Sequence, residues 1–300
     1  MLAAHVLIFK SYYDVDDRGS FLLALLAMTH SPISKPCRGH LFHRTTMLVG
    51  KPAMDRLGTL HVAVFGVGGV GSWTAESLIR SGVEHLTIVD SDVVCSTNVN
   101  RQLQATALNV GSPKVDELRK RLLEINPQAT IHARQMVYNE RTADQFDLRS
   151  FDYVIDAIDS LCNKVLLVQK CQEAGVTIYA SMGAGAKLDP TQIKVAKLVD
   201  TKMCPLARMV RKRLGRRKAS ADFLCVYSEE APLDPATETL CGTGNCACSH
   251  AHPKTPEPDS ENPDWCARKT RINGTAVHIT AVFGFMLAGL VIQDAVRRAN

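Results

Sequence analysis

A glycine-rich turn between a short apolar run and a helical pattern constrains this chain more than any other feature. The run reads His61-Val-Ala-Val-Phe-Gly-Val-Gly-Gly-Val-Gly71. In such a turn one glycine allows the tight bend, another lets the backbone approach a phosphate, and the last lets the helix pack close to the strand. The start of the helix also offers unpaired N–H groups and a partial positive charge. We therefore expect a nucleotide site whose phosphates are held by Gly66, Gly68, Gly69 and Gly71.

Apolar runs of strand length alternate with helical patterns from residue 61 to about residue 182. One helix is expected to open at Ser112-Pro113, a capping residue followed by proline at the first helical position, and another after Asp159-Ser160. This alternation predicts a doubly wound α/β fold with a mostly parallel, Rossmann-like sheet and helices on both faces. The expected strands are His61–Phe65, His85–Asp90, Thr130–Arg134, Tyr153–Ile158 and Val176–Ala180.

Polar residues that follow these strands suit a nucleoside triphosphate. Because ligands bind beyond the carboxyl ends of parallel strands, one crevice can gather Gly66 with the carboxylates that end later strands. Asp90 follows the glycine turn at the distance at which a carboxylate accepts hydrogen bonds from a ribose. NAD is the default ligand of such a turn, but NAD sites rarely need so much positive charge. The amide and cations that follow are suited to a triphosphate instead; they are Asn98, Arg101 and Lys114.

Two carboxylates in the segment Tyr153-Val-Ile-Asp-Ala-Ile-Asp-Ser160 form a second candidate feature. Carboxylates three residues apart at the end of a strand can hold Mg²⁺ through phosphates and water. The alternative for Asp159 is that its side chain caps the following helix. We expect Asp156 to serve Mg²⁺, and we expect the substitution Asp156→Ala to abolish turnover while leaving the fold intact.

The second half of the chain changes character and predicts a partly irregular C-terminal part. Strand patterns at Gln192–Val199 and Asp222–Tyr227 flank a basic helical pattern at Pro205–Lys218. Residues 229–270 hold six of the thirteen prolines, so they form a loop unless a metal orders them. Four cysteines there allow a structural Zn²⁺ site, unbound thiols, or a sulfur-transfer or redox role; they are Cys241, Cys246, Cys248 and Cys266.

The two ends of the chain lie outside the alternating pattern. Residues 1–40 lack the features of a secretory signal and are expected to be a poorly ordered extension of a domain spanning 41–300. Ten cysteines without such a signal favour a cytoplasmic protein. Ala276–Ile292 carries no formal charge, which predicts a buried helix at about 276–298, with a membrane-associated segment as the alternative.

Taken together, the motifs resemble the ThiF/MoeB branch of the ubiquitin-activating-enzyme-like superfamily. Two further segments, Cys204–Arg208 and Val226–Glu230, are similar to the tRNA-modifying dehydratases of that branch. The resemblance covers roughly residues 40–300 without the proline-rich loop, and it departs at Leu41, where many relatives carry arginine. It rests on His43-Arg44-Thr45, Gly66–Gly71, Asp90, Asn98–Gln102, Lys114, Val154–Ser160 and Gly183–Thr191.

The resemblance implies a reaction, a set of residue roles and partners. The reaction is the ATP-dependent dehydration of threonylcarbamoyladenosine next to the tRNA anticodon, through adenylation of the threonyl carboxylate and ring closure. Arg44 matches an arginine that reaches into the partner subunit of a homodimer. A cysteine desulfurase or sulfur acceptor is a further possible partner. By position, the implied roles are phosphate binding by the four glycines, Asn98, Arg101 and Lys114, ribose binding by Asp90, nucleotide binding by Asp159 and a place at Mg²⁺ for Asp156.

A tRNA substrate also gives a possible role to the run Arg208–Lys218, where seven of eleven residues are basic. Such a run usually marks a solvated helix face, but it also suits contact with RNA phosphates. The net charge of +5 fits an anionic partner without requiring one.

Three other functions stay open on the sequence. The first is adenylation of a ubiquitin-like sulfur-carrier protein, which the lack of a clear catalytic-cysteine region disfavours. The second is a non-enzymatic nucleotide-binding scaffold of a cysteine desulfurase system, which the intact Arg101, Lys114 and Asp156 disfavour. The third is an NAD-dependent oxidoreductase, for which no His or Tyr/Lys catalytic arrangement is present.

Overall fold

A computed structural model describes residues 38–237 and 273–299 of the chain. It divides into two compact units, Met1–Leu41 and Phe42–Asn300. Within the first unit the only described element is the short helix α3 (Arg38–Leu41). The four cysteines expected to form a metal site, and most of the proline-rich loop, lie outside the described residues.

A seven-stranded sheet in the order β3-β2-β1-β4-β5-β7-β6 forms the centre of the second unit. All neighbouring strands pair in parallel except β6, which runs antiparallel to β7 at one edge. The central strands are buried on both faces, as continuous apolar runs in parallel sheets are. The strands are β1 (His61–Phe65), β2 (His85–Val89), β3 (Thr130–Arg134), β4 (Tyr153–Asp156), β5 (Thr177–Ser181), β6 (Ile193–Lys197) and β7 (Leu224–Ser228).

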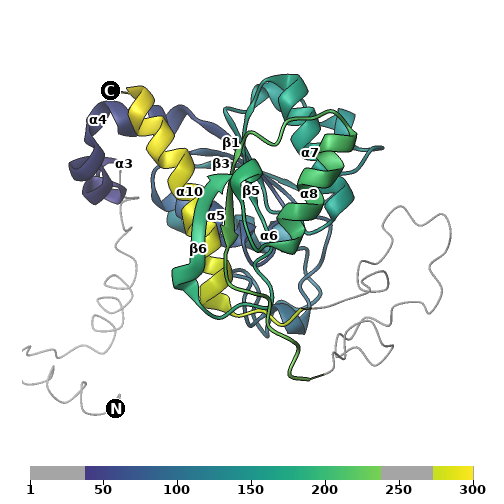
Figure 1. Cartoon of the computed structure of the whole chain (residues 1–300). Coiled ribbons are helices and arrows are strands. Elements are labelled where there is room, and N and C mark those ends of the chain that lie inside the picture. The colour runs from purple at the N-terminus through teal and green to yellow at the C-terminus, as the bar shows by residue number, and fades with distance from the viewer. Residues whose placement is uncertain (1–37, 238–272, 300) are drawn as a thin grey trace, which may run out of the picture. The chain divides into compact units, whose positions relative to one another are not determined.

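Helices cover both faces of this sheet, which confirms the predicted doubly wound fold (Figure 1). Helix α5 packs against α6 and α10, and α10 also packs against α4, whereas α7 packs against α8 on the opposite face. The chain leaves β1 toward β2 and leaves β4 toward β5, so β1 and β4 flank the point where the winding reverses. The helices are α4 (His43–Thr59), α5 (Gly71–Arg80), α6 (Lys114–Ile125), α7 (Leu161–Ala174), α8 (Pro205–Arg216) and α10 (Val277–Ala299).

Helix α10 matches the helix expected at about 276–298. It is long and apolar enough to cross a membrane by composition, but half of its most apolar window is buried within the protein. Ile279, Phe283, Leu287 and Val291 recur every four residues and are fully buried. A Cβ on Gly284 would lie 2.7 Å from the carbonyl oxygen of Val70, so α10 and the start of α5 touch through backbone. Packing against α4 and α5 therefore accounts for the apolar face of α10.

Several boundaries differ from those the sequence predicts. β2 ends at Val89 and β4 at Asp156, one and two residues earlier than expected. Helix α7 begins at Leu161 with Ser160 in the capping position, so Asp159 stands outside the helix and does not cap it. Helix α4 was not predicted, and its two halves meet at a kink at Gly50.

Candidate functional site

The glycine turn joins β1 to α5 at the switch point of the sheet, and two of its glycines are irreplaceable on steric grounds. Gly66 adopts φ +87°, and a Cβ there would lie 2.7 Å from the carbonyl oxygen of Ala157 at the end of β4. A Cβ on Gly71 would lie 1.8 Å from the carbonyl oxygen of Gly66, which no repacking could relieve. The first turn of α5 carries no side-chain cap. The N–H of Ser72 in this turn donates to the carbonyl oxygen of Gly68 at 3.2 Å, so an anion would be served by the N–H groups that have no such partner.

A buried glutamine lies beside this turn with an unpaired oxygen. Gln102 is 6% exposed, its Nε2 lies 3.7 Å from where a Cβ on Gly68 would stand, and its Oε1 has no hydrogen-bond partner among the described residues. Buried polar atoms are almost always satisfied, so this acceptor calls for a donor, such as a hydroxyl or amino group of a bound ligand, and not for a phosphate oxygen. Gln102 belongs to the motif Asn98–Gln102, but its residue type and position gave no indication of this role.

Asp90, Asp92 and Lys114 form a charged cluster next to the glycine turn. The carboxylate of Asp90 accepts hydrogen bonds from the backbone N–H of Val67 at 2.8 Å and of Asp92 at 2.9 Å. Lys114 is buried and its Nζ lies 2.7 Å from Oδ2 of Asp92. Burial raises the pKa of Asp90, against the opposing effect of Lys114. Burial alone would lower the pKa of Lys114, but Asp90 and Asp92 outweigh it and raise that pKa.

Two further predicted phosphate ligands stand in the segment around the short 3₁₀-helix η1 (Ser96–Asn98). The buried Asn98 accepts a hydrogen bond from the N–H of Cys95 through Oδ1 at 3.0 Å, which leaves its Nδ2 as the donor available to an anion. Arg101 donates from Nη1 to the carbonyl oxygen of Thr97 at 2.8 Å, and its Cγ lies 3.4 Å from where a Cβ on Gly69 would stand. Arg101 therefore borders the glycine turn, and Asn98 lies three residues before it in the same segment.

Asp156 and Asp159 lie at the same edge of the sheet, but Asp156 is buried and Asp159 is exposed to solvent. Asp156 is fully buried: its Oδ2 lies 2.8 Å from Nζ of the equally buried Lys164, and its Oδ1 accepts from the N–H of Ile158 at 3.0 Å. Burial raises the pKa of Asp156, while Lys164 opposes the shift. Asp159 is exposed and acts electrostatically on Lys114. Asp159 therefore faces the charged cluster around Lys114. Asp156 is instead enclosed with Lys164, a residue for which the sequence predicted no role.

Arg44 lies apart from this cluster. It is exposed in the first turn of α4, and no described contact joins it to the glycine turn, so its assignment to a partner subunit's site stays a prediction. Within the residues that the structure describes, no group of three or more His, Cys, Asp or Glu side chains could hold a metal ion. The Mg²⁺ and Zn²⁺ assignments stay predictions as well.

The C-terminal helix adds a wall that the sequence did not place at the site. Thr280 of α10 would lie 3.1 Å from a Cβ on Gly69, and Asn100 donates from Nδ2 to the carbonyl oxygen of Thr275 at 2.9 Å. Behind this wall the loop after β5 carries the buried Lys187, whose Nζ donates to the carbonyl oxygen of Glu230. The first two of these contacts bring segments 175 or more residues apart together beside the glycine turn.

Comparisons with known proteins agree with this geometry. The tRNA threonylcarbamoyladenosine dehydratase of Bacillus subtilis (strain 168) is 36% identical over 258 residues, covering 86% of this chain and 95% of the relative. Solved structures of the Escherichia coli dehydratase TcdA with AMP and with ATP superpose with TM-scores of 0.73 and 0.72 at 30% identity, covering 87% of this chain and 96% of theirs. A sulfur carrier protein adenylyltransferase of Thermus thermophilus matches only 42% of this chain, at 33% identity over 128 residues. The ThiF family model, finally, matches residues 42–298, and the chain belongs to the ThiF family.

Proposed function

We propose that this protein catalyses the ATP-dependent dehydration of threonylcarbamoyladenosine in tRNA, closing the threonylcarbamoyl side chain into a ring. The observation that carries the proposal is the match to dehydratases over nearly their whole length, joined to an intact nucleotide crevice. The sulfur-carrier enzyme matches less than half of the chain, which makes carrier adenylation the weaker candidate.

The crevice fits ATP on two observations of this structure. The glycine turn leaves a cradle that a Cβ at Gly66 or Gly71 would destroy, and Gln102 beside it holds an unpaired acceptor oxygen that a hydroxyl or amino group of the nucleotide would satisfy. Within this cradle, Asp90 is placed to receive the ribose hydroxyls. Three cationic or amide groups then border the phosphates; they are Asn98, Arg101 and Lys114.

A magnesium ion fits the exposed Asp159 better than the buried Asp156. Both oxygens of Asp156 are engaged with Lys164 and Ile158, so this carboxylate cannot turn to the phosphates without breaking a buried ion pair. We assign Asp159 as the carboxylate that would hold Mg²⁺, which when bound neutralises charge on the phosphates. Asp156 then acts as a positioning residue, because its carboxylate accepts a hydrogen bond from the N–H of Ile158 and so shapes the turn that presents Asp159.

The chemistry proceeds in two displacements. First, a carboxylate oxygen of the threonyl group attacks the α-phosphorus of ATP, the bond to pyrophosphate breaks, and an acyl-adenylate forms. Then the carbamoyl group of the same side chain attacks the activated carbonyl carbon, loses a proton, and AMP leaves with the former carboxylate oxygen. The net change is loss of one water from the nucleoside. An attacker held in the same molecule needs no protein nucleophile, because its effective concentration is already high.

The homodimer and the role of Arg44 belong to this proposal. Arg44 is exposed on α4, away from the cluster around Lys114, so it serves a site only if another copy of the chain approaches. Equilibrium sedimentation of the wild type tests whether the protein is a dimer. Mixing the Arg44→Ala variant with the Lys114→Met variant tests whether the two subunits share a site. Recovery of activity on mixing supports a shared site, and two variants that stay inactive together contradict it.

Isotope transfer tests the reaction itself. The enzyme is incubated with ATP, Mg²⁺ and tRNA whose threonylcarbamoyl carboxylate carries ¹⁸O. The proposal expects a nucleoside lighter by one water and AMP that carries ¹⁸O. Label in inorganic phosphate would show activation by phosphorylation, and an unchanged nucleoside with pyrophosphate release dependent on a carrier protein would replace the proposal by carrier adenylation.

A further inference from the structure

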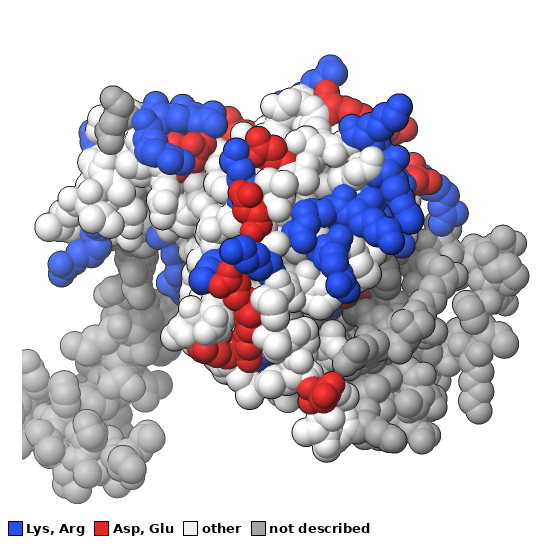
Figure 2. All heavy atoms as spheres, viewed as in Figure 1, with Lys and Arg blue, Asp and Glu red and all other residues white. Residues whose placement is uncertain are grey.

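A dense group of cations covers the outer side of α8. Figure 2 shows lysines and arginines gathered there into one blue patch. One basic residue of the run is structural: Arg211 donates from Nη1 to the carbonyl oxygens of Leu198 at 2.9 Å and Thr201 at 3.0 Å. The other six are exposed, and we call them the α8 basic face: Arg208, Lys212, Arg213, Arg216, Arg217 and Lys218.

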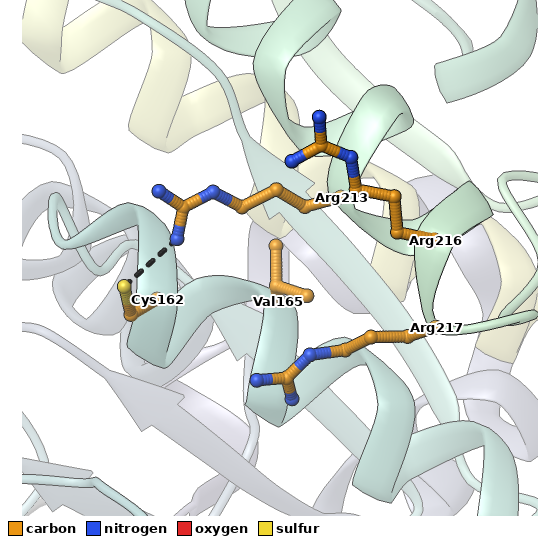
Figure 3. Close-up of a pocket in the computed structure, with 5 residues that line it drawn as sticks. All are labelled: Cys162, Val165, Arg213, Arg216 and Arg217. Atoms are coloured by element: carbon orange, nitrogen blue, oxygen red, sulfur yellow. Dashed lines mark hydrogen bonds between the residues drawn. The ribbon is translucent and has the colours of Figure 1, made fainter.

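Three of these arginines converge on a hollow between α8 and α7. Arg213, Arg216 and Arg217 line a cavity of about 240 Å³ together with Cys162 and Val165 of α7 (Figure 3). Arg213 reaches across it and donates from Nη1 to Sγ of Cys162 at 2.9 Å. A second cavity of about 390 Å³ shares Cys162 and Arg217 and continues to Arg141. The two hollows share lining residues and thus form one track lined by guanidinium groups, with the carboxylate of Glu140 also on its wall.

The positive charge of this track is largely uncompensated. Arg217 lies 3.6 Å from a carboxylate oxygen of Glu140, but Lys212, Arg213 and Arg216 have no carboxylate within ion-pair distance among the described residues. The negative end of a helix dipole favours cations in its last turn. That effect explains Arg213 and Arg216 at the end of α8. It does not explain the other exposed cations of the α8 basic face, or why three arginines line a hollow beside α7.

The track opens close to the nucleotide crevice. Helix α7 begins at Leu161, two residues after Asp159, and Cys162 in its first turn lines both hollows. An extended polyanion on the track therefore passes the carboxyl end of β4, where the chemistry is proposed to occur. No aromatic side chain lines either hollow, so the track offers no platform for stacking bases.

We propose that the α8 basic face and the hollow between α7 and α8 hold consecutive backbone phosphates of the tRNA substrate. The inference rests on the proposed function, since it takes tRNA as the substrate. Guanidinium groups pair with phosphates in a bidentate manner, and three of them facing one hollow match a backbone rather than a base edge. Binding here is therefore electrostatic and independent of sequence, and it does not distinguish modified from unmodified tRNA.

A charge-matched pair of variants tests the proposal. Arg213→Gln, Arg216→Gln and Arg217→Gln are combined in one protein, and Lys51→Gln, Arg119→Gln and Lys120→Gln in a control that removes three charges from α4 and α6. Fluorescence anisotropy gives the Kd for tRNA with and without threonylcarbamoyladenosine over a range of salt. For the first variant we expect affinity to fall about tenfold or more, and the slope of log K against log salt to shrink by about 2. The control keeps the wild-type values.

Three readouts separate the possible results. Calorimetric titration of ATP should give the wild-type affinity for both variants, which shows that the fold is intact, and the KM for tRNA should rise only in the first. If the first variant binds tRNA like the wild type while the wild type dehydrates its substrate, the track is overturned and the proposed function stands. If the wild type neither binds nor modifies tRNA, both proposals fail.

Discussion

The buried pair of Asp156 and Lys164 makes the sharpest stability prediction. Both side chains are fully buried, their charged atoms lie 2.8 Å apart, and Lys164 also donates to the carbonyl oxygen of Ser181 at 3.0 Å. Asp156→Ala leaves an ammonium group in the core with one carbonyl as partner. Removing one member of a buried ion pair costs about 3–5 kcal/mol, because the other charge stays desolvated. At about 2–4 °C per kcal/mol for a domain of this size, the melting temperature should fall by roughly 6–20 °C.

This expectation replaces the one drawn from the sequence, which had Asp156→Ala leave the fold intact. The structure predicts that this variant loses activity in large part because it is less stable. The whole free energy of unfolding of a domain is only about 5–15 kcal/mol, so the expected loss is a large share of it. The substitution Asp156→Asn combined with Lys164→Met removes both charges while keeping the side-chain shapes. We expect this double variant to be considerably more stable than the sum of the two single changes implies.

Urea unfolding followed by circular dichroism at pH 7 measures each free energy of unfolding, and the single variants Asp156→Asn and Lys164→Met complete the double-mutant cycle. A coupling energy near zero, or an Asp156→Ala protein as stable as the wild type, would refute the assignment of a buried ion pair. If the double variant is stable and still binds ATP, calorimetric titration can measure separately what Asp156 contributes to the site.

Three further substitutions probe the site and its support. Gly71→Ala should abolish ATP binding in calorimetry, since its Cβ would lie 1.8 Å from the carbonyl oxygen of Gly66; unchanged affinity would contradict the turn geometry. Lys114→Met should weaken ATP binding about tenfold or more but spare adenosine, and equal loss of both would remove Lys114 from the phosphates. Burial would raise the pKa of Glu76, but hydrogen bonds from Arg121 and its neighbours lower it below the ordinary 4.5. Glu76→Gln should therefore cost about 1 kcal/mol at pH 7, and urea unfolding should show this difference shrinking as the pH falls below 4.5 and through the lowered pKa of Glu76.

The fold was predictable from sequence because most of its strands and helices have a recognisable pattern within a short segment of the chain. The apolar run His61–Phe65 is the strand β1 to the residue, and Gly66 and Gly71 occupy the positions that the motif demands. Strand ends were less predictable, because side chains decide them: β4 stops at Asp156, whose carboxylate turns back onto Ile158.

The pairing inside the site could not be predicted in the same way. In the sequence, Lys164 looks like an ordinary surface lysine of a helix. It does, however, directly precede the apolar run Val165–Val168, which was a signal that its side chain is buried. The wall formed by Thr280 comes from a helix more than 200 residues after Gly69, and no local pattern encodes a contact at that separation. The unpaired oxygen of Gln102 is a property of the packed structure alone.

Helix α10 has a consequence for the order of events during synthesis. Its Gly284 accepts a hydrogen bond from Thr74 at 3.2 Å and its Thr280 lies against Gly69, so the phosphate turn acquires its last wall from residues translated more than 200 codons later. At elongation rates of about 5–20 residues per second, the nascent turn waits roughly 10–40 s for that helix to leave the ribosome. During this interval the apolar side of α5 stays uncovered. Nascent chains stalled before residue 277 should therefore recruit chaperones and fail to retain ATP, whereas released full-length chains should do neither.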